Sequence, residues 1–203
     1  QDYLDGGKKP DETTARAILG QYLTNIKLEN CTYHKAVVHS IMRKVPFRLK
    51  GEQFGYKGEG SSYQALTGKV AKSIKGFRDN EGITIQPVNP ANFKLTFQYD
   101  RKNVQVQTGK LCVKLVEGEW VSYQVNNDEN WKPKLAIGVL AEESSNIKII
   151  INNQIVGNYN LNKSNKWQEL AVTSNYELPK GSTDLRLVVN EGSIKLDWID
   201  RSS

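Results

Sequence analysis

Carboxylates, histidines and cysteines are the side chains of this sequence that most often do chemistry, and none stands in a catalytic pattern. Hydrolysis by a carboxylate pair needs two groups about 5–10 Å apart across a cleft, but no pair here occupies a recognisable motif; Glu117 and Glu119 flank a turn and are interpreted as fold residues. His34 and His39, the only histidines, have no metal-ligand or nucleophile pattern beside them. Phosphate loops, dinucleotide fingerprints and H-E-x-x-H are lacking. The sequence therefore predicts no enzyme in this chain.

The four tryptophans differ in their sequence surroundings. Trp167 follows the polar turn 163–166, where a ring has little to bury against, which favours a role in ligand contact. Trp131 lies in a polar loop and is a second exposed candidate, without an assigned role. Trp120 and Trp198 lie within strand-like runs and are expected to fill the core.

Composition indicates a globular protein with one well-buried domain and a smaller appendage. The chain has 203 residues, 38% hydrophobic and 25% charged. No apolar run approaches the roughly 20 residues of a membrane span. The net charge of +6 comes from Lys and Arg scattered along the chain, so we expect a solvated basic surface and no nucleic-acid partner. Residues 1–5 lack signal-peptide features, and the start at Gln1 is interpreted as a mature form or an excised piece.

Cys31 and Cys112 lie far apart and form no C-x-x-C motif, so a metal site is not expected. Two alternatives stay open: one long-range disulfide in a secreted protein, or two unpaired buried thiols.

The pattern of apolar and polar residues changes near Pro46. Before it, residues 10–13 are typical of a helix start, and the apolar residues that follow fall at helical spacing, at Ala15, Ile18, Leu19, Tyr22 and Leu23. Residues 31–38 are expected to form a strand. A helix and a strand bury little apolar surface alone, so residues 1–45 are predicted to be a linker or the tail of a preceding catalytic domain. The alternative is an extension folded onto the rest of this chain.

After Pro46 the pattern is β throughout. Short apolar or alternating runs are separated by turn residues, at 82–86, 93–99, 104–107, 110–116, 120–125, 134–140, 146–151, 168–172, 184–189 and 193–199. Many short strands without helices between them predict an antiparallel sandwich or barrel.

Six tracts, in order, resemble family 6 carbohydrate-binding modules, the jelly-roll domains appended to many polysaccharide-degrading enzymes. They cover about three quarters of the chain and are Val45–Phe54, Gly76–Ile85, Gly118–Val125, Asn165–Gln168, Leu178–Val188 and Ile194–Ile199. The resemblance implies a mainly β protein, a jelly-roll β-sandwich over residues 46–203 with a short N-terminal helix-containing extension.

The resemblance also implies a sugar site in the loops at one end of the sandwich. Its two stacking rings fall on Phe77 and Trp167, and its polar contact falls on Lys195. Phe77 stands where Tyr or Trp is usual and has packing as its alternative role. Lys195 stands where Asn is usual, and Lys offers donors only. Lys195 is therefore either a selector for anionic sugars or a solvated residue of a decayed site.

Many members of the family hold a structural calcium. Glu52 and Asp197 match two of its ligands, whereas Lys50 occupies a usual ligand position. The expectation is either one structural calcium or no cofactor, with the Lys50 ammonium paired directly to Glu52 or Asp197 in place of the ion.

The function expected from the resemblance is non-catalytic binding of a polysaccharide or oligosaccharide, which targets an attached glycoside hydrolase to its substrate. The alternatives are a structural sandwich that packs against a catalytic domain and keeps a vestigial sugar site, and a small jelly-roll lyase or hydrolase. The expected location is extracellular, periplasmic or at the cell surface.

Overall fold

The computed structural model describes residues 5–9, 11–31, 41–44, 47–66, 77–78, 80–93, 99–100, 103–104 and 110–201. The chain divides into two compact units, Gln1–Val38 and His39–Ser203.

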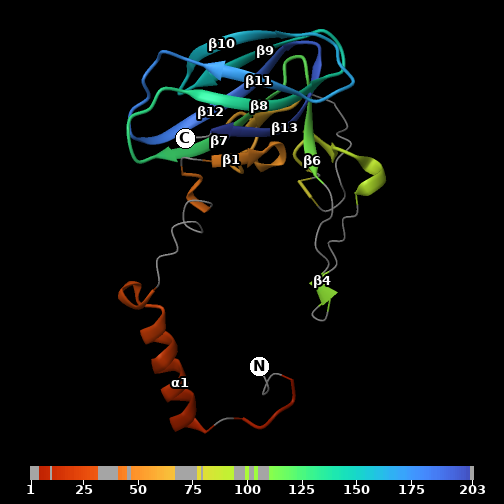
Figure 1. Ribbon diagram of the computed structural model, residues 1–203. Coiled ribbons are helices and arrows are strands. Elements are labelled where there is room, and N and C mark those ends of the chain that lie inside the picture. The colour runs from red at the N-terminus through yellow and green to blue at the C-terminus, as the bar shows by residue number, and fades with distance from the viewer. Residues whose placement is uncertain are drawn as a thin grey trace. The chain divides into compact units, whose positions relative to one another are not determined.

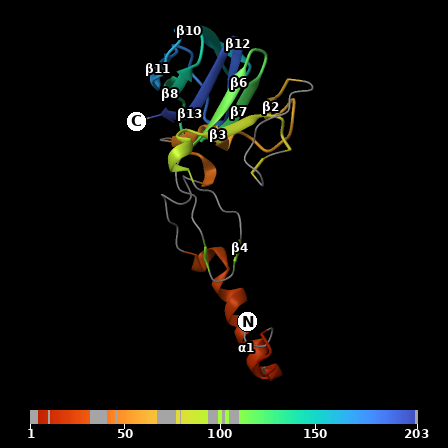
Figure 2. The same ribbon diagram turned by 90° about the vertical axis from the view of Figure 1, so that its right-hand side faces the viewer.

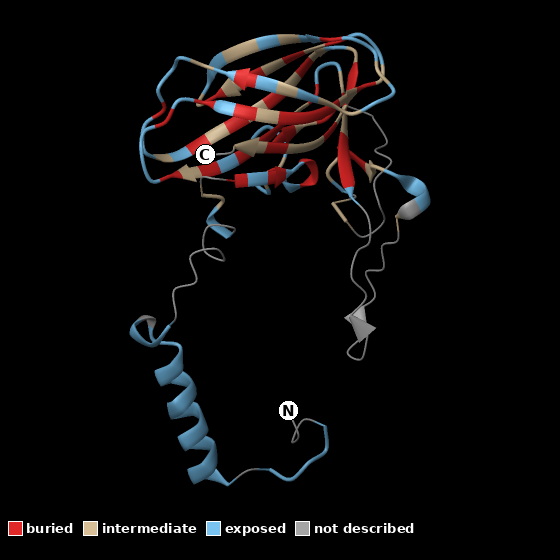
Figure 3. Ribbon diagram, in the orientation of Figure 1, coloured by how far each residue is buried: buried red, intermediate tan, exposed pale blue. Residues whose placement is uncertain are grey.

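The first unit contains helix α1 (Glu12–Asn25) and the short 3-10 helix η1 (Leu28–Asn30). Asp11 caps α1, because its carboxylate accepts a hydrogen bond from the Thr14 backbone N–H at 2.9 Å. This confirms the predicted helix start. No residue of α1 is buried, as the pale blue ribbon in Figure 3 shows, and its apolar stripe is more than half exposed at Ile18, Leu19, Tyr22 and Leu23. The strand expected over 31–38 lies, apart from Cys31, outside the described residues.

Two antiparallel sheets make up the second unit (Figures 1 and 2). The first has the order β11–β8–β13–β6–β3, with β1 also paired to β13. Its strands are β1 (Phe47–Lys50), β3 (Thr84–Pro87), β6 (Leu111–Val116), β8 (Lys134–Ala141), β11 (Gln168–Thr173) and β13 (Ser193–Arg201).

The second sheet has the order β10–β9–β12–β7–β2. Its strands are β2 (Tyr63–Gln64), β7 (Trp120–Asn127), β9 (Ser145–Ile151), β10 (Gln154–Leu161) and β12 (Gly181–Glu191). A separate two-stranded ribbon joins β4 (Tyr99–Asp100) to β5 (Asn103–Val104), and two 3-10 helices, η2 (Gly51–Gln53) and η3 (Pro90–Asn92), lie between strands.

The core lies between the two sheets because alternate residues of each strand point inward. In β9 the inward residues are Ile147, Ile149 and Ile151, all fully buried, and in β13 they include Ile194 and Leu196. Each such side chain contributes about 1.5–3 kcal/mol when fully buried. The mainly β sandwich expected from the sequence is confirmed.

Strand β10 was not predicted, and its position explains why. It is an edge strand in which Leu161 is the one buried residue, so its sequence lacks apolar alternation. The runs predicted at 93–99 and 104–107 lie mostly outside the described residues.

Both cysteines are free thiols. Cys112 is buried in β6, and burial raises the pKa of its thiol to about 12, so it is a poor nucleophile at neutral pH. Cys31 is exposed, so the expectation of two buried thiols is half correct. In the described part of the chain, no helix is both long and apolar enough to cross a membrane.

Candidate ligand-binding site

Several of the connections that pass between the two sheets lie at one end of the sandwich. Strand β8 ends there at Ala141, whereas β11 begins there at Gln168 and β13 at Ser193. Gly192, with φ +76°, makes the turn into β13, and a Cβ added to it would lie 2.6 Å from the Ser144 carbonyl oxygen. This turn therefore requires glycine.

Strand register places two of the sequence-predicted site residues in one row at this end. Lys195 pairs with Leu140 of β8 on one side and with Lys114 of β6 on the other. Gln168 pairs with Val139, so continuing that register sets Trp167 beside Leu140. Neighbouring strands lie about 4.8 Å apart, which puts Trp167 about 10 Å from Lys195. Trp167 is half-buried, as expected for a ring at a polar turn that still meets solvent.

Phe77 lies in the segment that leads into β3, whose first residue, Thr84, pairs with Lys114. Its half-buried side chain packs against the hydrophobic core. This contact matches the packing alternative, and a stacking role for Phe77 stays a prediction.

Lys195 belongs to a cluster of three charged groups. Its Nζ lies 2.9 Å from Glu142 Oε1, and the Lys114 Nζ lies 2.5 Å from Glu142 Oε2. The three side chains are between a quarter and a third exposed. Burial alone would raise the pKa of Glu142, but hydrogen bonds from Lys114 and Lys195 outweigh it and lower that pKa. The Lys195 ammonium is therefore ion-paired and about a quarter exposed. Both expectations for its role toward a sugar, selection of an anionic ligand and a decayed site, stay predictions.

Arg78, next to Phe77, is a residue whose role the sequence did not reveal. Its guanidinium, 4% exposed, pairs with Glu81 at 2.5 Å and lies over the Phe54 ring at 3.5 Å. It also donates hydrogen bonds to the carbonyl oxygens of residues 52, 54 and 55, at 3.2, 2.7 and 2.6 Å. Arg78 thereby fastens the segment that carries Phe77 to the chain that follows β1.

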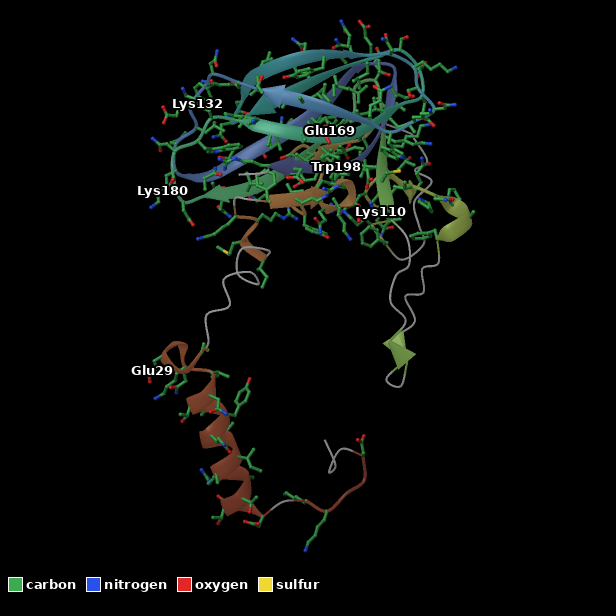
Figure 4. All side chains as sticks on the ribbon, viewed as in Figure 1. Glu29, Lys110, Lys132, Glu169, Lys180 and Trp198 are labelled. Atoms are coloured by element: carbon green, nitrogen blue, oxygen red, sulfur yellow. The ribbon has the colours of Figure 1, made fainter. Side chains whose placement is uncertain are left out.

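The remaining tryptophans reverse their expected positions. Trp131 is 5% exposed and belongs to the core, where its backbone pairs with Leu178. Trp120 and Trp198 are half-buried on outer faces, because their neighbours Val121 and Ile199 take the inward positions. Trp198 is labelled on β13 in Figure 4. A guanidinium lies over each of these two rings: Arg186 is 3.9 Å from the centre of the Trp120 ring, and Arg48 is 4.3 Å from that of Trp198.

A hollow of about 300 Å³ on the outer face of the second sheet is a further surface that the sequence did not indicate. Its floor is polar, with Ser122, Gln124 and Asn126 of β7 and Asp184 of β12, and Tyr56, 72% exposed, lies at its side. Residues 41–43 border it, and the Asn126 side chain donates a hydrogen bond to the Met42 carbonyl oxygen at 2.7 Å.

The two carboxylates expected to hold calcium lie where the pairing partner of β13 changes from β6 to β1. Asp197 sits at an irregularity in the register, between the residues paired with β6 and those paired with β1. Glu52 is in η2, which comes close to β13: a Cβ on Gly51 would lie 2.2 Å from the Leu196 carbonyl oxygen. Glu52 is 5% exposed, and its Oε2 has no hydrogen-bond partner among the described residues.

These groups fit a hard cation. Burial raises the pKa of Glu52, and the nearby Asp197 raises it further; burial also raises the pKa of Asp197. Glu52, Asp197 and backbone carbonyls would hold calcium, whose charge would stabilise both carboxylates. The described residues contain no group of three His, Cys, Asp or Glu for a metal, so the remaining ligands would be carbonyls and water.

Lys50 does not take the place of the ion. It is exposed, and within the described part of the chain no ion pair joins it to Glu52 or Asp197. It lowers the pKa of both carboxyls only through space. The expected direct pairing is therefore not present.

Calcium is expected to stabilise the wild-type protein. A ligand at 100 times its Kd adds about 2.7 kcal/mol, which raises Tm by about 5–10 °C for a domain of this size. In the metal-free protein the raised pKa of Glu52 means that the folded state holds this proton more tightly than the unfolded chain does, so stability declines as pH rises above the ordinary Glu value of 4.5. Calorimetric melting of wild type and Glu52→Gln at pH 5 and 7 checks both effects. Glu52→Gln should lose the calcium response and most of the decline; an equal calcium response in both proteins would contradict this site.

The fold and the site together define the class of protein: an antiparallel β-sandwich with a partly exposed aromatic ring and a polar cluster at the strand ends. Residues 96–202 match the family model for the carbohydrate binding module (family 6), which is more than half of the 203 residues. The chain belongs to this family, a family of non-catalytic binding modules, as the sequence tracts indicated.

Solved structures share the fold. A family 6 module from Clostridium stercorarium in complex with cellobiose is 12% identical, with a TM-score of 0.50 over 79% of this chain and 95% of that one. A family 6 module from Clostridium cellulolyticum in complex with xylose is 14% identical, with a TM-score of 0.50 over 79% and 99%. Comparison with curated proteins finds no match.

Proposed function

We propose that the sandwich binds a polysaccharide or oligosaccharide, without cleaving it, through Trp167 and the Lys195–Glu142 pair. The observation that carries this proposal is the row of strand ends that sets the partly exposed Trp167 about two strands from Lys195. A pyranose has an apolar C–H face that lies well on an aromatic ring, while its hydroxyls need donors and acceptors at the rim. This end of the sandwich offers both.

The burial of Glu119, next to the turn, supports a binding role over catalysis for this carboxylate. Glu119 is fully buried and accepts hydrogen bonds from the backbone N–H groups of Leu66 and Val116. It therefore holds the fold together and is not available as an acid or base. A lyase or hydrolase activity gains no support from it.

We also propose that the module serves an attached glycoside hydrolase outside the cytoplasm, where polymeric carbohydrate is found. The support is helix α1, whose apolar stripe is more than half exposed and is suited to packing against a further domain. A structural role beside such a domain is the second candidate, favoured by the packing of Phe77 against the core.

A glycan array probed with the purified chain tests the binding function. The expected result is selective retention of plant, algal or fungal oligosaccharides with Kd values in the micromolar to millimolar range, about −8 to −4 kcal/mol. An array without hits, from a chain shown to be folded, would leave only the structural role. Release of reducing ends from a hit would show catalysis instead.

A further inference from the structure

Arg43 is a half-buried arginine that lines the hollow on the outer face of the second sheet. Burial lowers the pKa of its guanidinium, and the neighbouring charge of Arg78 also lowers it. Within the part of the chain that the structure describes, no carboxylate, carbonyl or hydroxyl pairs with this guanidinium. Charges that proteins remove from water are normally paired, because an unpaired one is costly. The Arg43 guanidinium is therefore suited to an anion that comes from outside the chain.

The backbone around Arg43 is fixed on both sides by the end of β7. Arg43 has φ 49°, a left-handed conformation that is uncommon outside glycine and costs free energy. Asn126 donates from its backbone N–H to the Arg43 carbonyl oxygen at 3.1 Å, and from its side chain to the Met42 carbonyl oxygen. The next residue, Lys44, pairs with Asp128 at 2.9 Å. These contacts hold the strained conformation, so the position of Arg43 at the hollow is built into the fold.

The charge balance of the hollow is positive. Among the described residues of its lining, Arg43 and Lys57 are cationic and Asp184 is anionic. Asp184 is already engaged, because its carboxylate accepts a hydrogen bond from the Ser122 hydroxyl and lies 3.7 Å from the Arg186 guanidinium. It is not among the groups that shift the pKa of Arg43. An oxyanion in the hollow would therefore meet two cations and one carboxylate that a third cation balances.

The other groups of the lining also suit an oxyanion. A guanidinium can donate two parallel hydrogen bonds to a carboxylate or a sulfate. Ser61 and Gln124 add a hydroxyl and an amide that can donate to the same ligand. The volume of about 300 Å³ lies at the lower end of the range for small-molecule sites. The hollow can thus hold an oxyanion together with part of the molecule that carries it.

We propose that the hollow is an oxyanion site, in which Arg43 binds a carboxylate or a sulfate group and Lys57 assists by its charge. Both residues precede residues 96–202, which match the family model, so this site lies partly outside that match. The inference goes beyond the proposed function, because the hollow would recognise a charge rather than the hydroxyls of a sugar at the strand ends. Uronic or sulfated polysaccharides and free inorganic anions share this chemistry.

NMR titrations at constant ionic strength, with chloride as the background anion, test the site in wild type, Arg43→Gln and Arg48→Gln. The probes are sodium sulfate and a uronic-acid oligosaccharide. In wild type we expect saturable shift changes at the amides of 41–43, 56–57 and 61–62. Arg43→Gln should weaken this binding about tenfold or more, because a bond between two charged groups is lost. Arg48→Gln is the matched control: it removes an arginine from β1, in the first sheet, and should change binding by less than about threefold.

Lys57→Gln provides a second variant for the same titrations. Lys57 is exposed, so its replacement leaves the fold intact, and it should weaken oxyanion binding in the same direction as Arg43→Gln but by less. Tighter binding of the oligosaccharide than of sulfate would identify a polysaccharide as the source of the oxyanion. Equal affinities would identify a free anion. Thermal melting of each variant confirms that it is folded.

The outcomes separate this inference from the proposed function. Equal binding of both probes by wild type and Arg43→Gln overturns the inference, as does the absence of saturable shifts around the hollow. Binding that is lost in Lys195→Gln and kept in Arg43→Gln would also overturn it, because the anion would then lie at the strand ends. If the chain binds no array glycan but binds sulfate through Arg43, the proposed function fails while the inference stands.

Discussion

Replacing Arg78 with Gln is expected to lower the free energy of unfolding by about 3–5 kcal/mol, the cost of breaking a buried ion pair. The guanidinium is 4% exposed and joins Glu81 to three backbone carbonyls on the chain after β1. Gln is too short to reach these partners, so buried acceptors and a partly buried carboxylate are left without donors. Chemical denaturation at neutral pH measures the loss.

Arg48→Gln is a matched control for that experiment. Arg48 also pairs with a carboxylate, Asp200 at 3.2 Å, and also lies over an aromatic ring, Trp198 at 4.3 Å. Its side chain is 56% exposed, however, so its removal should cost less than about 1 kcal/mol. An equal decrease in the free energy of unfolding in the two variants would contradict the stabilising role that the contacts of Arg78 indicate.

Replacing Trp167 with Ala is expected to weaken sugar binding by about 2 kcal/mol or more, which is about thirtyfold. A half-buried ring at the start of an edge strand contributes less to the core than to a ligand stacked on it. The thermal midpoint should therefore fall by only a few degrees. Calorimetric titration with an array hit measures the first effect and scanning calorimetry the second.

Tyr56→Ala distinguishes the two candidate surfaces. Tyr56 is 72% exposed and lies beside the hollow on the second sheet, away from the row that contains Lys195. The proposal predicts unchanged binding in this variant. Loss of binding in Tyr56→Ala together with normal binding in Trp167→Ala would move the site to the hollow.

The sequence predicted the fold well where one face of a strand is buried. The alternation in β9 and β12 and the turns that bound them could be read directly, because inward and outward residues differ in polarity. The sequence did not predict β10, because an edge position removes the contrast between inward and outward residues. It also misplaced Trp120 and Trp198, because alternation alone does not say which face of a strand points inward.

The site was predictable only in part, because its chemistry arises from pairing across strands. Lys195 was identified through the family resemblance, but its partner Glu142 follows a different strand and has no local signature. Arg78 was also visible within its tract, yet the three carbonyls that it binds are more than 20 residues away. Such contacts join residues that are distant in the sequence, so a short motif cannot predict them.

An NMR titration of the isotope-labelled chain with an oligosaccharide tests whether the sugar binds at the strand ends. We expect the largest chemical-shift changes at the Trp167 indole N–H and at the backbone amides of 142–144, 162–168 and 192–195, which connect the two sheets at this end. Shifts confined to the hollow lined by Ser122 and Asp184, or no shifts with any array glycan, would contradict a sugar site at the strand ends.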